Sequence, residues 1–328
     1  ERELALLSPK SQWEVPGPYA TTCVEVDSWA SVEDGDLAVY AQLPIGADLE
    51  PLPVVVLSHG LGGDHHGYGP LGAHLASHGY AVLHPQYLDS RGCLVASGQI
   101  DPVPAGGPQA DEAVAAVIKP MLFDPQHWWS RVRRAHVLLD SLAAQRHLPL
   151  KLDPSGVAVI GHSYGAYTTQ LLIGTRLSGV DSRFDGCAHA AVGCGVLISP
   201  QGSGDRGLTP RSWAAVTVPM MVITSERDFG PHGESVAWRR EPFDRAGSPL
   251  KHLVVIGDSD HHMGGIAATG TTSPLDHRGL DRAPAPAVVA AFAAAFVQAA
   301  RGDLAAAAWL AADPLSNFVQ NEHIGGFR

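Results

Sequence analysis

Short apolar segments bounded by Gly, Pro, Asp or Ser recur along the chain and alternate with longer segments of helical periodicity. A short apolar run between turn residues predicts a buried strand, and apolar residues repeating every three to four positions predict an amphipathic helix. The predicted strands are residues 23–29, 37–43, 54–58, 81–84, 157–161, 195–199, 220–224 and 252–256. The predicted helices are residues 70–78, 128–146, 166–176, 233–245 and 287–301.

From the third strand onward, the alternation of strand and helix is typical of parallel βαβ units. Several strands are nearly continuous Val, Ile and Leu, as expected for strands that helices cover on both faces. We therefore predict an α/β fold with a mostly parallel sheet of about eight strands, in one domain over residues 1–328. Residues 86–127 interrupt the alternation and are rich in Gly, Pro and Ala. We interpret this segment as a lid-like insertion, because long segments of this kind are usually functional or mobile.

The main candidate for chemistry is the pentapeptide Gly161-His162-Ser163-Tyr164-Gly165, which joins a predicted strand to a predicted helix. A serine on such a tight turn is presented at the carboxyl edge of the sheet, where the helix N-terminus directs N–H groups toward developing negative charge. The flanking glycines remove Cβ atoms that would collide where strand and helix pass closely. A serine that merely caps the helix is the alternative. We predict that Ser163 is a nucleophile.

A glycine-rich turn, residues 59–63, follows the predicted strand 54–58. Hydrolysis by a serine requires two backbone N–H groups aimed at the tetrahedral oxyanion. We predict that Tyr164, directly after the nucleophile, supplies one of them and Leu61 the other. The turn has neither the Gly-Lys-Ser/Thr ending nor the Gly-x-Gly-x-x-Gly spacing of phosphate-binding loops, so a nucleotide site is not indicated.

An acid and a histidine follow two later strands in the chain order expected after such a serine. Asp228 stands just past the predicted strand 220–224, and His261 just past 252–256. His261 would accept the proton of Ser163, and Asp228 would hold the imidazole tautomer. The alternative histidine is His262, and the alternative acids are Glu226 and Asp205.

Two other classes of protein remain open at this point. Residues 64–66 (Asp-His-His) and 258–262 (Asp-Ser-Asp-His-His) concentrate metal-ligand types, so one alternative is a metal-dependent hydrolase. Adjacent histidines on extended backbone point in opposite directions, so we expect no metal site and no cofactor. The other alternative is a noncatalytic ligand-binding protein on the same scaffold, which would not require a complete triad.

Aromatic side chains and histidines near the strand ends and the insertion are candidates for the substrate pocket. Large aromatic residues are more often simply part of the core. The candidates are His59, His162, Tyr87, Trp128 and Trp129, together with Tyr164 and Trp213.

Composition narrows the class further. The 328 residues carry a formal net charge of −11, which argues against nucleic acid as a partner because phosphate backbones are bound by Lys and Arg. No apolar stretch is long enough to predict a membrane span.

The four cysteines lack the paired spacing of a zinc site, although Cys187 and Cys194 would close a small loop if bonded. The chain begins at Glu1 instead of Met, which favours a secreted or periplasmic enzyme whose signal peptide was removed.

Three runs, residues 57–63, 75–80 and 161–165, resemble bacterial relatives of platelet-activating-factor acetylhydrolase and dienelactone hydrolase, over roughly residues 37–265. The resemblance implies an α/β-hydrolase fold acting on esters or lactones without a metal. It implies Ser163 as nucleophile, Leu61 and Tyr164 as oxyanion donors, and His261 as the triad histidine.

The chain departs from both families. Dienelactone hydrolase uses a cysteine nucleophile, whereas this chain has Ser163. The acetylhydrolase takes its acid from the loop after the preceding strand, where residues 197–202 hold no carboxylate, so Asp228 stays the predicted acid. Cutinase-like polyester hydrolases share the architecture. We expect a carboxylic-ester hydrolase whose partner is a small or polymeric ester: a neutral acyl ester, a lactone or a polyester fragment.

Overall fold

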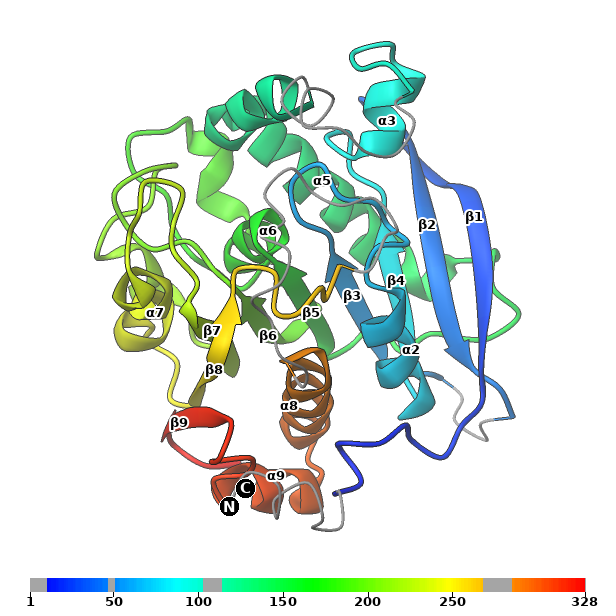
Figure 1. Cartoon of the computed structure of the whole chain (residues 1–328). Coiled ribbons are helices and arrows are strands. Elements are labelled where there is room, and N and C mark those ends of the chain that lie inside the picture. Colours follow the sequence, from blue (N-terminus) through cyan, green and yellow to red (C-terminus); the bar gives the residue numbers. More distant parts are fainter. Residues whose placement is uncertain (1–10, 47–50, 103–113, 268–284, 328) are drawn as a thin grey trace.

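The computed structural model describes residues 11–46, 51–102, 114–267 and 285–327. One sheet joins nine strands of these residues in the order β1-β2-β4-β3-β5-β6-β7-β8-β9 (Figure 1). The strands are β1 Thr21–Val32, β2 Gly35–Pro44, β3 Val54–Ser58, β4 Ala81–Pro85, β5 Val157–His162, β6 Val192–Ile198, β7 Met220–Arg227, β8 Lys251–Asp260 and β9 Val319–Ile324.

The sheet is mostly parallel. All pairs from β4 through β3, β5, β6 and β7 to β8 are parallel, whereas β1, β2 and β9 add antiparallel edges. Every residue of β3, β4 and β5 is buried, because helices cover both faces of the centre. This mixed α/β sheet is consistent with the α/β-hydrolase fold. The prediction of about eight strands missed β9, whose mostly exposed sequence lacks the apolar run of a central strand.

The helices lie on both faces of the sheet, and alternate strand residues pack against each layer. The helices are α2 Gly69–Ser77, α3 Arg91–Ala96, α5 Pro125–Ser141, α6 Tyr164–Leu172, α7 Val236–Arg245, α8 Ala285–Ala300 and α9 Leu304–Ala311. Val54 and Val56 share one apolar cluster with residues of α5, α6 and α7, whereas Val55 and Leu57 share the other with α2, α8 and α9. Figure 1 shows α8 crossing in front of the sheet beside α2.

The insertion predicted at residues 86–127 holds helical structure of its own. It contains α3, helical residues 114–118 and the 3₁₀ segment Lys119–Phe123, while its residues 103–113 lie outside the described part. Leu94, Ile118 and Met121 belong to a small apolar cluster against which Leu61 packs. The insertion therefore covers the glycine-rich turn that follows β3.

Several details differ from the sequence-based expectations. The helix predicted at 128–146 begins earlier, with Pro125 in its first turn and Asp124 accepting a hydrogen bond from the N–H of Gln126. Both α3 and α9 were not predicted, because each is too short for a clear repeat. Cys23, Cys93, Cys187 and Cys194 are free thiols, so no disulfide closes the loop from 187 to 194. Among the described helices, none combines the length and apolar character needed to cross a bilayer.

Candidate active site

Ser163 occupies the turn between β5 and α6 with φ 55° and ψ −118°. A non-glycine residue rarely adopts this conformation, so the turn is strained. Two backbone hydrogen bonds hold it: the Ser163 N–H donates to the Ile198 carbonyl at 2.9 Å, and the Ser163 carbonyl accepts from the Tyr167 N–H at 3.1 Å. The side chain of Ser163 is half-buried at the carboxyl edge of the sheet.

The two glycines of the pentapeptide allow close backbone packing. A Cβ atom on Gly161 would overlap the carbonyl of Gly165, and one on Gly165 would overlap the carbonyl of Ser58. Because Ser58 ends β3, this contact brings the serine turn against the start of the glycine-rich turn. The residues predicted to supply the nucleophile and the second oxyanion donor therefore lie on adjacent segments.

Ser163, His261 and Asp228 form one hydrogen-bonded line. His261 Nε2 lies 2.9 Å from Ser163 Oγ, and His261 Nδ1 lies 2.7 Å from Asp228 Oδ1. Asp228 follows β7 and His261 follows β8, and these strands are parallel neighbours, so both side chains emerge at the same edge.

The alternative residues lie elsewhere. The ring that faces Ser163 is that of His261, while the N–H of His262 donates to Asp260 Oδ1 at 2.8 Å. Glu226 is exposed and accepts from the N–H of Asp258, and Asp205 pairs with the side chain of Arg206 at 2.9 Å.

Asp228 is fully buried and ionised. Burial by itself raises the pKa of a carboxyl group, but the neighbouring Arg239 guanidinium and the His261 imidazole outweigh it and hold the pKa of Asp228 well below its usual range. Thr224 Oγ1 donates to Asp228 Oδ2 at 2.9 Å. Each carboxylate oxygen therefore has its own partner, and Oδ1 faces His261.

The sequence did not predict Arg239 of α7 as a partner of the acid. Its Nε lies 3.0 Å from Asp228 Oδ1, and its other nitrogens donate to the carbonyls of Ser199, Pro200 and Phe229 at 3.0–3.2 Å. These carbonyls belong to the loops after β6 and β7. No local signal marks this residue, because Arg239-Arg240-Glu241 is typical of a solvent-exposed helix face.

The surroundings of His261 disfavour the protonated form of its imidazole. Burial lowers the pKa of His261 below 6.5, the nearby Asp228 partly offsets this, and Arg239 lowers it again. A neutral imidazole that faces a serine hydroxyl through Nε2 can accept the proton of that hydroxyl.

A buried network joins the serine turn to the glycine-rich turn. Burial lowers the pKa of His162 to about 3, so its ring is neutral. His162 Nε2 lies 2.8 Å from the His261 carbonyl and must carry the proton, since a carbonyl only accepts. His162 Nδ1 therefore accepts from the Tyr68 hydroxyl at 2.8 Å, and that hydroxyl accepts from the Gly60 N–H at 3.2 Å.

Arg131 of α5 holds the glycine-rich turn by hydrogen bonds to its backbone. Its guanidinium pairs with both oxygens of Asp89 at 2.7 and 2.8 Å and donates to the carbonyls of His59 and Gly60 at 2.8 and 3.2 Å. It lies 4.4 Å from the ring centre of Tyr87 and 4.2 Å from that of Tyr164. No sequence pattern indicated this residue, which is as buried as the apolar core.

The predicted pocket residues make mainly internal contacts. His59 donates through Nδ1 to the Gly60 carbonyl at 2.7 Å, and the Tyr87 hydroxyl lies 2.8 Å from Ser58 Oγ. Trp128 is buried edge-on against Tyr167, and Trp129 packs against Phe184. Trp213 is fully buried, and Tyr164 donates to the Met121 carbonyl at 3.3 Å. These side chains are thus engaged within the protein, and any contact with substrate stays a prediction.

Comparison with known families gives one match. The model of the family "Platelet-activating factor acetylhydrolase, isoform II" matches residues 27–100. The resemblance to the acetylhydrolases is confirmed. The matched segment holds β2, β3, β4 and the glycine-rich turn and ends before Ser163. The similarity to this family supports a serine-dependent ester hydrolase. A search of curated proteins found no match.

Proposed function

We propose that this protein is a carboxylic-ester hydrolase in which Ser163, His261 and Asp228 act as a catalytic triad. The observation that carries the proposal is the continuous line from Asp228 Oδ1 through both ring nitrogens of His261 to Ser163 Oγ, with contacts of 2.7 and 2.9 Å. This is the geometry that a serine needs to lose its proton as it attacks a carbonyl carbon.

The reaction proceeds in two halves. Ser163 Oγ attacks the ester carbonyl while His261 Nε2 takes its proton; the tetrahedral intermediate then collapses, and His261 returns the proton to the departing alcohol. A water molecule, deprotonated by His261, then attacks the acyl-enzyme, and His261 returns that proton to Ser163 Oγ as the acid is released. Asp228 stabilises the imidazolium that forms in each half.

The backbone N–H groups of Leu61 and Tyr164 are the proposed oxyanion donors. Tyr164 is the first residue of α6, where N–H groups have no intrahelical acceptor. Leu61 lies in the turn whose preceding carbonyls are held by Arg131. Removal of one such donor typically costs about 3 kcal/mol of transition-state stabilisation.

The insertion supports neutral, apolar acyl groups as substrates. Leu94, Ile118 and Met121 form an apolar cluster in contact with Leu61, so the segment predicted to be a lid presents hydrocarbon near the proposed oxyanion donors. Acyl esters, lactones and polyester fragments therefore fit better than charged substrates.

The test combines covalent labelling with turnover. We expect a fluorophosphonate probe to label Ser163 and the enzyme to hydrolyse p-nitrophenyl butyrate, and Ser163→Ala to lose both, with kcat reduced by roughly 10⁴-fold or more. Ser178→Ala, at an exposed serine, is the matched control and should retain both. Undiminished hydrolysis by Ser163→Ala would reject the proposal. A ligand that raises the Tm, with no turnover across a broad ester panel, would favour the binding-protein alternative.

A further inference from the structure

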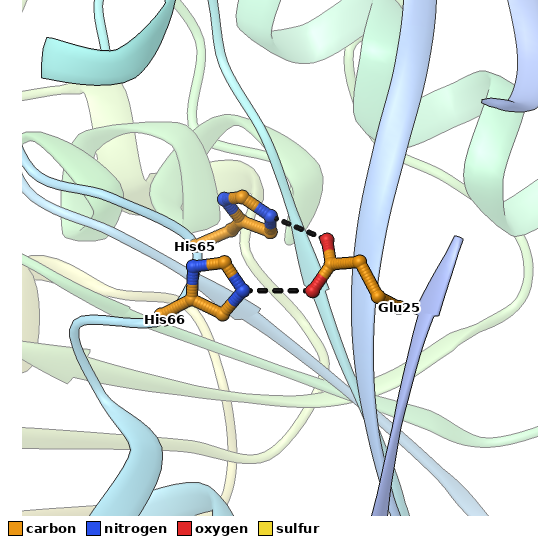
Figure 2. A group of neighbouring side chains, drawn as sticks. All are labelled: Glu25, His65 and His66. Carbon is orange, nitrogen blue, oxygen red and sulfur yellow. Dashed lines mark hydrogen bonds and ion pairs between the residues drawn. The ribbon is translucent and has the colours of Figure 1, made fainter. Parts of the chain in front are cut away.

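A second cluster of chemically active side chains lies where the edge of the sheet meets the segment after the glycine-rich turn. Figure 2 shows Glu25 of β1 facing the imidazoles of His65 and His66. His65 Nε2 lies 2.8 Å from Glu25 Oε1, and His66 Nε2 lies 2.7 Å from Glu25 Oε2. One ligand atom from each of the three residues lies within 4.8 Å of the others.

Both imidazoles face the same way because the backbone turns here. The N–H of His66 donates to Asp64 Oδ1 at 2.9 Å, and the N–H of Gly67 donates to the Asp64 carbonyl at 2.9 Å. The two ring centres are consequently only 4.0 Å apart. The sequence-based expectation of no metal site assumed extended backbone, on which neighbouring side chains point in opposite directions. Because the backbone turns at residues 64–67, that assumption does not hold for His65 and His66.

Asp64 lies on the side of the two rings opposite Glu25, next to their Nδ1 atoms. Its Oδ1 lies 2.9 Å from His66 Nδ1 and 3.2 Å from His65 Nδ1. Metal-binding histidines usually donate their second N–H to a carboxylate in this way, which fixes the tautomer and leaves the other nitrogen free to coordinate. Asp64 therefore holds the His66 ring by a hydrogen bond and lies beside the His65 ring, and Nε2 of both rings faces Glu25.

We propose that Glu25, His65 and His66 bind a divalent transition-metal ion of the zinc class, with Asp64 as the outer carboxylate. Two imidazole nitrogens and one carboxylate oxygen are a donor set that zinc accepts. The two carboxylates supply two negative charges against two neutral rings, so a dication neutralises the cluster.

Metal binding requires only small movements. Bonds of about 2.0–2.2 Å to the three ligands place the ligand atoms of a tetrahedral site roughly 3.4 Å apart. The contacts of 2.7 and 2.8 Å between imidazole and carboxylate therefore open by less than ~1 Å. The ligand atoms, which lie within 4.8 Å of one another, close by at most about 1.4 Å. The ion replaces the protons that Nε2 shares with Glu25, so binding releases protons and weakens as the pH falls.

The site is open on one side and tied down on the other. The side chain of His65 is 9% exposed, whereas those of His66 and Glu25 are 51% and 41% exposed. Solvent can therefore supply the remaining ligand. An ion here would fasten the segment that follows Gly63 to β1, so its expected effect is on stability and not on bond cleavage at Ser163.

The test measures zinc binding to the full chain after removal of metal with EDTA. We expect one equivalent of Zn²⁺ to bind by isothermal titration calorimetry, with release of protons and an increase in Tm. His66→Ala and Glu25→Gln should each weaken binding by at least 10-fold. Both side chains are largely exposed, so the variants should fold. His232→Ala, at an exposed histidine elsewhere, is the matched control and should bind as the wild type does.

Two results would overturn the proposal. One is the absence of stoichiometric binding by the wild type, which would leave the cluster as an ion-pair network alone. The other is unchanged binding by His66→Ala and Glu25→Gln, which would place the ion elsewhere. Co²⁺ provides a second check, because a site of nitrogen and oxygen ligands gives d–d absorption without a thiolate charge-transfer band. Fluorophosphonate labelling of Ser163 should persist in the metal-free protein, so failure of this proposal and failure of the proposed hydrolase are distinguishable.

Discussion

Arg239 Nε lies 3.0 Å from Asp228 Oδ1, the same oxygen that faces His261 Nδ1 at 2.7 Å. A buried cation thus shares the carboxylate of the proposed triad with the imidazole. The arrangement keeps Asp228 ionised, and it also disfavours a proton on His261, because burial and the nearby guanidinium both lower the pKa of that imidazole.

Arg239→Lys and Arg239→Gln should separate the two effects of this cation. Lysine keeps the charge but loses the planar fork that donates to the loops after β6 and β7, so we expect kcat/KM to fall by roughly 10²-fold with little change in the pH profile. Glutamine also removes the charge, which raises the pKa of His261 and moves the acid limb of the profile to higher pH. Identical acid limbs in the wild type and Arg239→Gln would show that the residue acts through structure alone.

Asp228→Asn tests the assignment of the acid. The amide cannot stabilise an imidazolium and favours the wrong tautomer of His261, so we expect kcat for p-nitrophenyl butyrate to fall by roughly 10⁴-fold. Glu226→Gln, at the exposed alternative, is the control and should stay within about twofold of the wild type, as expected for a surface residue. A large loss in Glu226→Gln with none in Asp228→Asn would reverse the assignment.

The pH dependence of kcat/KM should have an acid limb with a midpoint below 6.5, because burial lowers the pKa of His261 beneath that value. Only the neutral imidazole can accept the serine proton, so the rate falls as the pH falls through this pKa and is constant above it. Steady-state rates with p-nitrophenyl acetate across the acid range would locate the midpoint. A midpoint above 6.5 would mean that Asp228 outweighs burial in setting this pKa.

Asp89→Asn should destabilise the fold as well as the glycine-rich turn. It leaves the buried guanidinium of Arg131 without its anion, and breaking such a pair typically costs about 3–5 kcal/mol. Burial by itself raises the pKa of Asp89, but the Arg131 guanidinium outweighs it and lowers that pKa. The stabilisation by this pair is therefore present above about pH 4 and is lost as the pH falls further. Urea unfolding at neutral and acidic pH would measure both effects, and Asp140→Asn, at a largely exposed carboxylate, is the control.

The sequence by itself predicted the strands and helices that position the active site. Apolar runs and helical periodicity are local patterns, and the central strands are apolar along their whole length, so β3, β5 and α6 could be recognised without a structure. Ser163, Asp228 and His261 were found because each follows a strand, and the carboxyl ends of parallel strands meet at one edge. Their chemical roles remain proposals.

Only the tertiary structure revealed the side chains that support this line. Arg131 reaches His59 across 72 residues of sequence, and Glu25 reaches His65 across 40. Neither spacing carries a signal, since a polar residue in an amphipathic helix or an edge strand is compatible with solvent exposure. Burial and partner choice depend on how separate elements pack, whereas hydrophobic periodicity reports only which face of one element is covered.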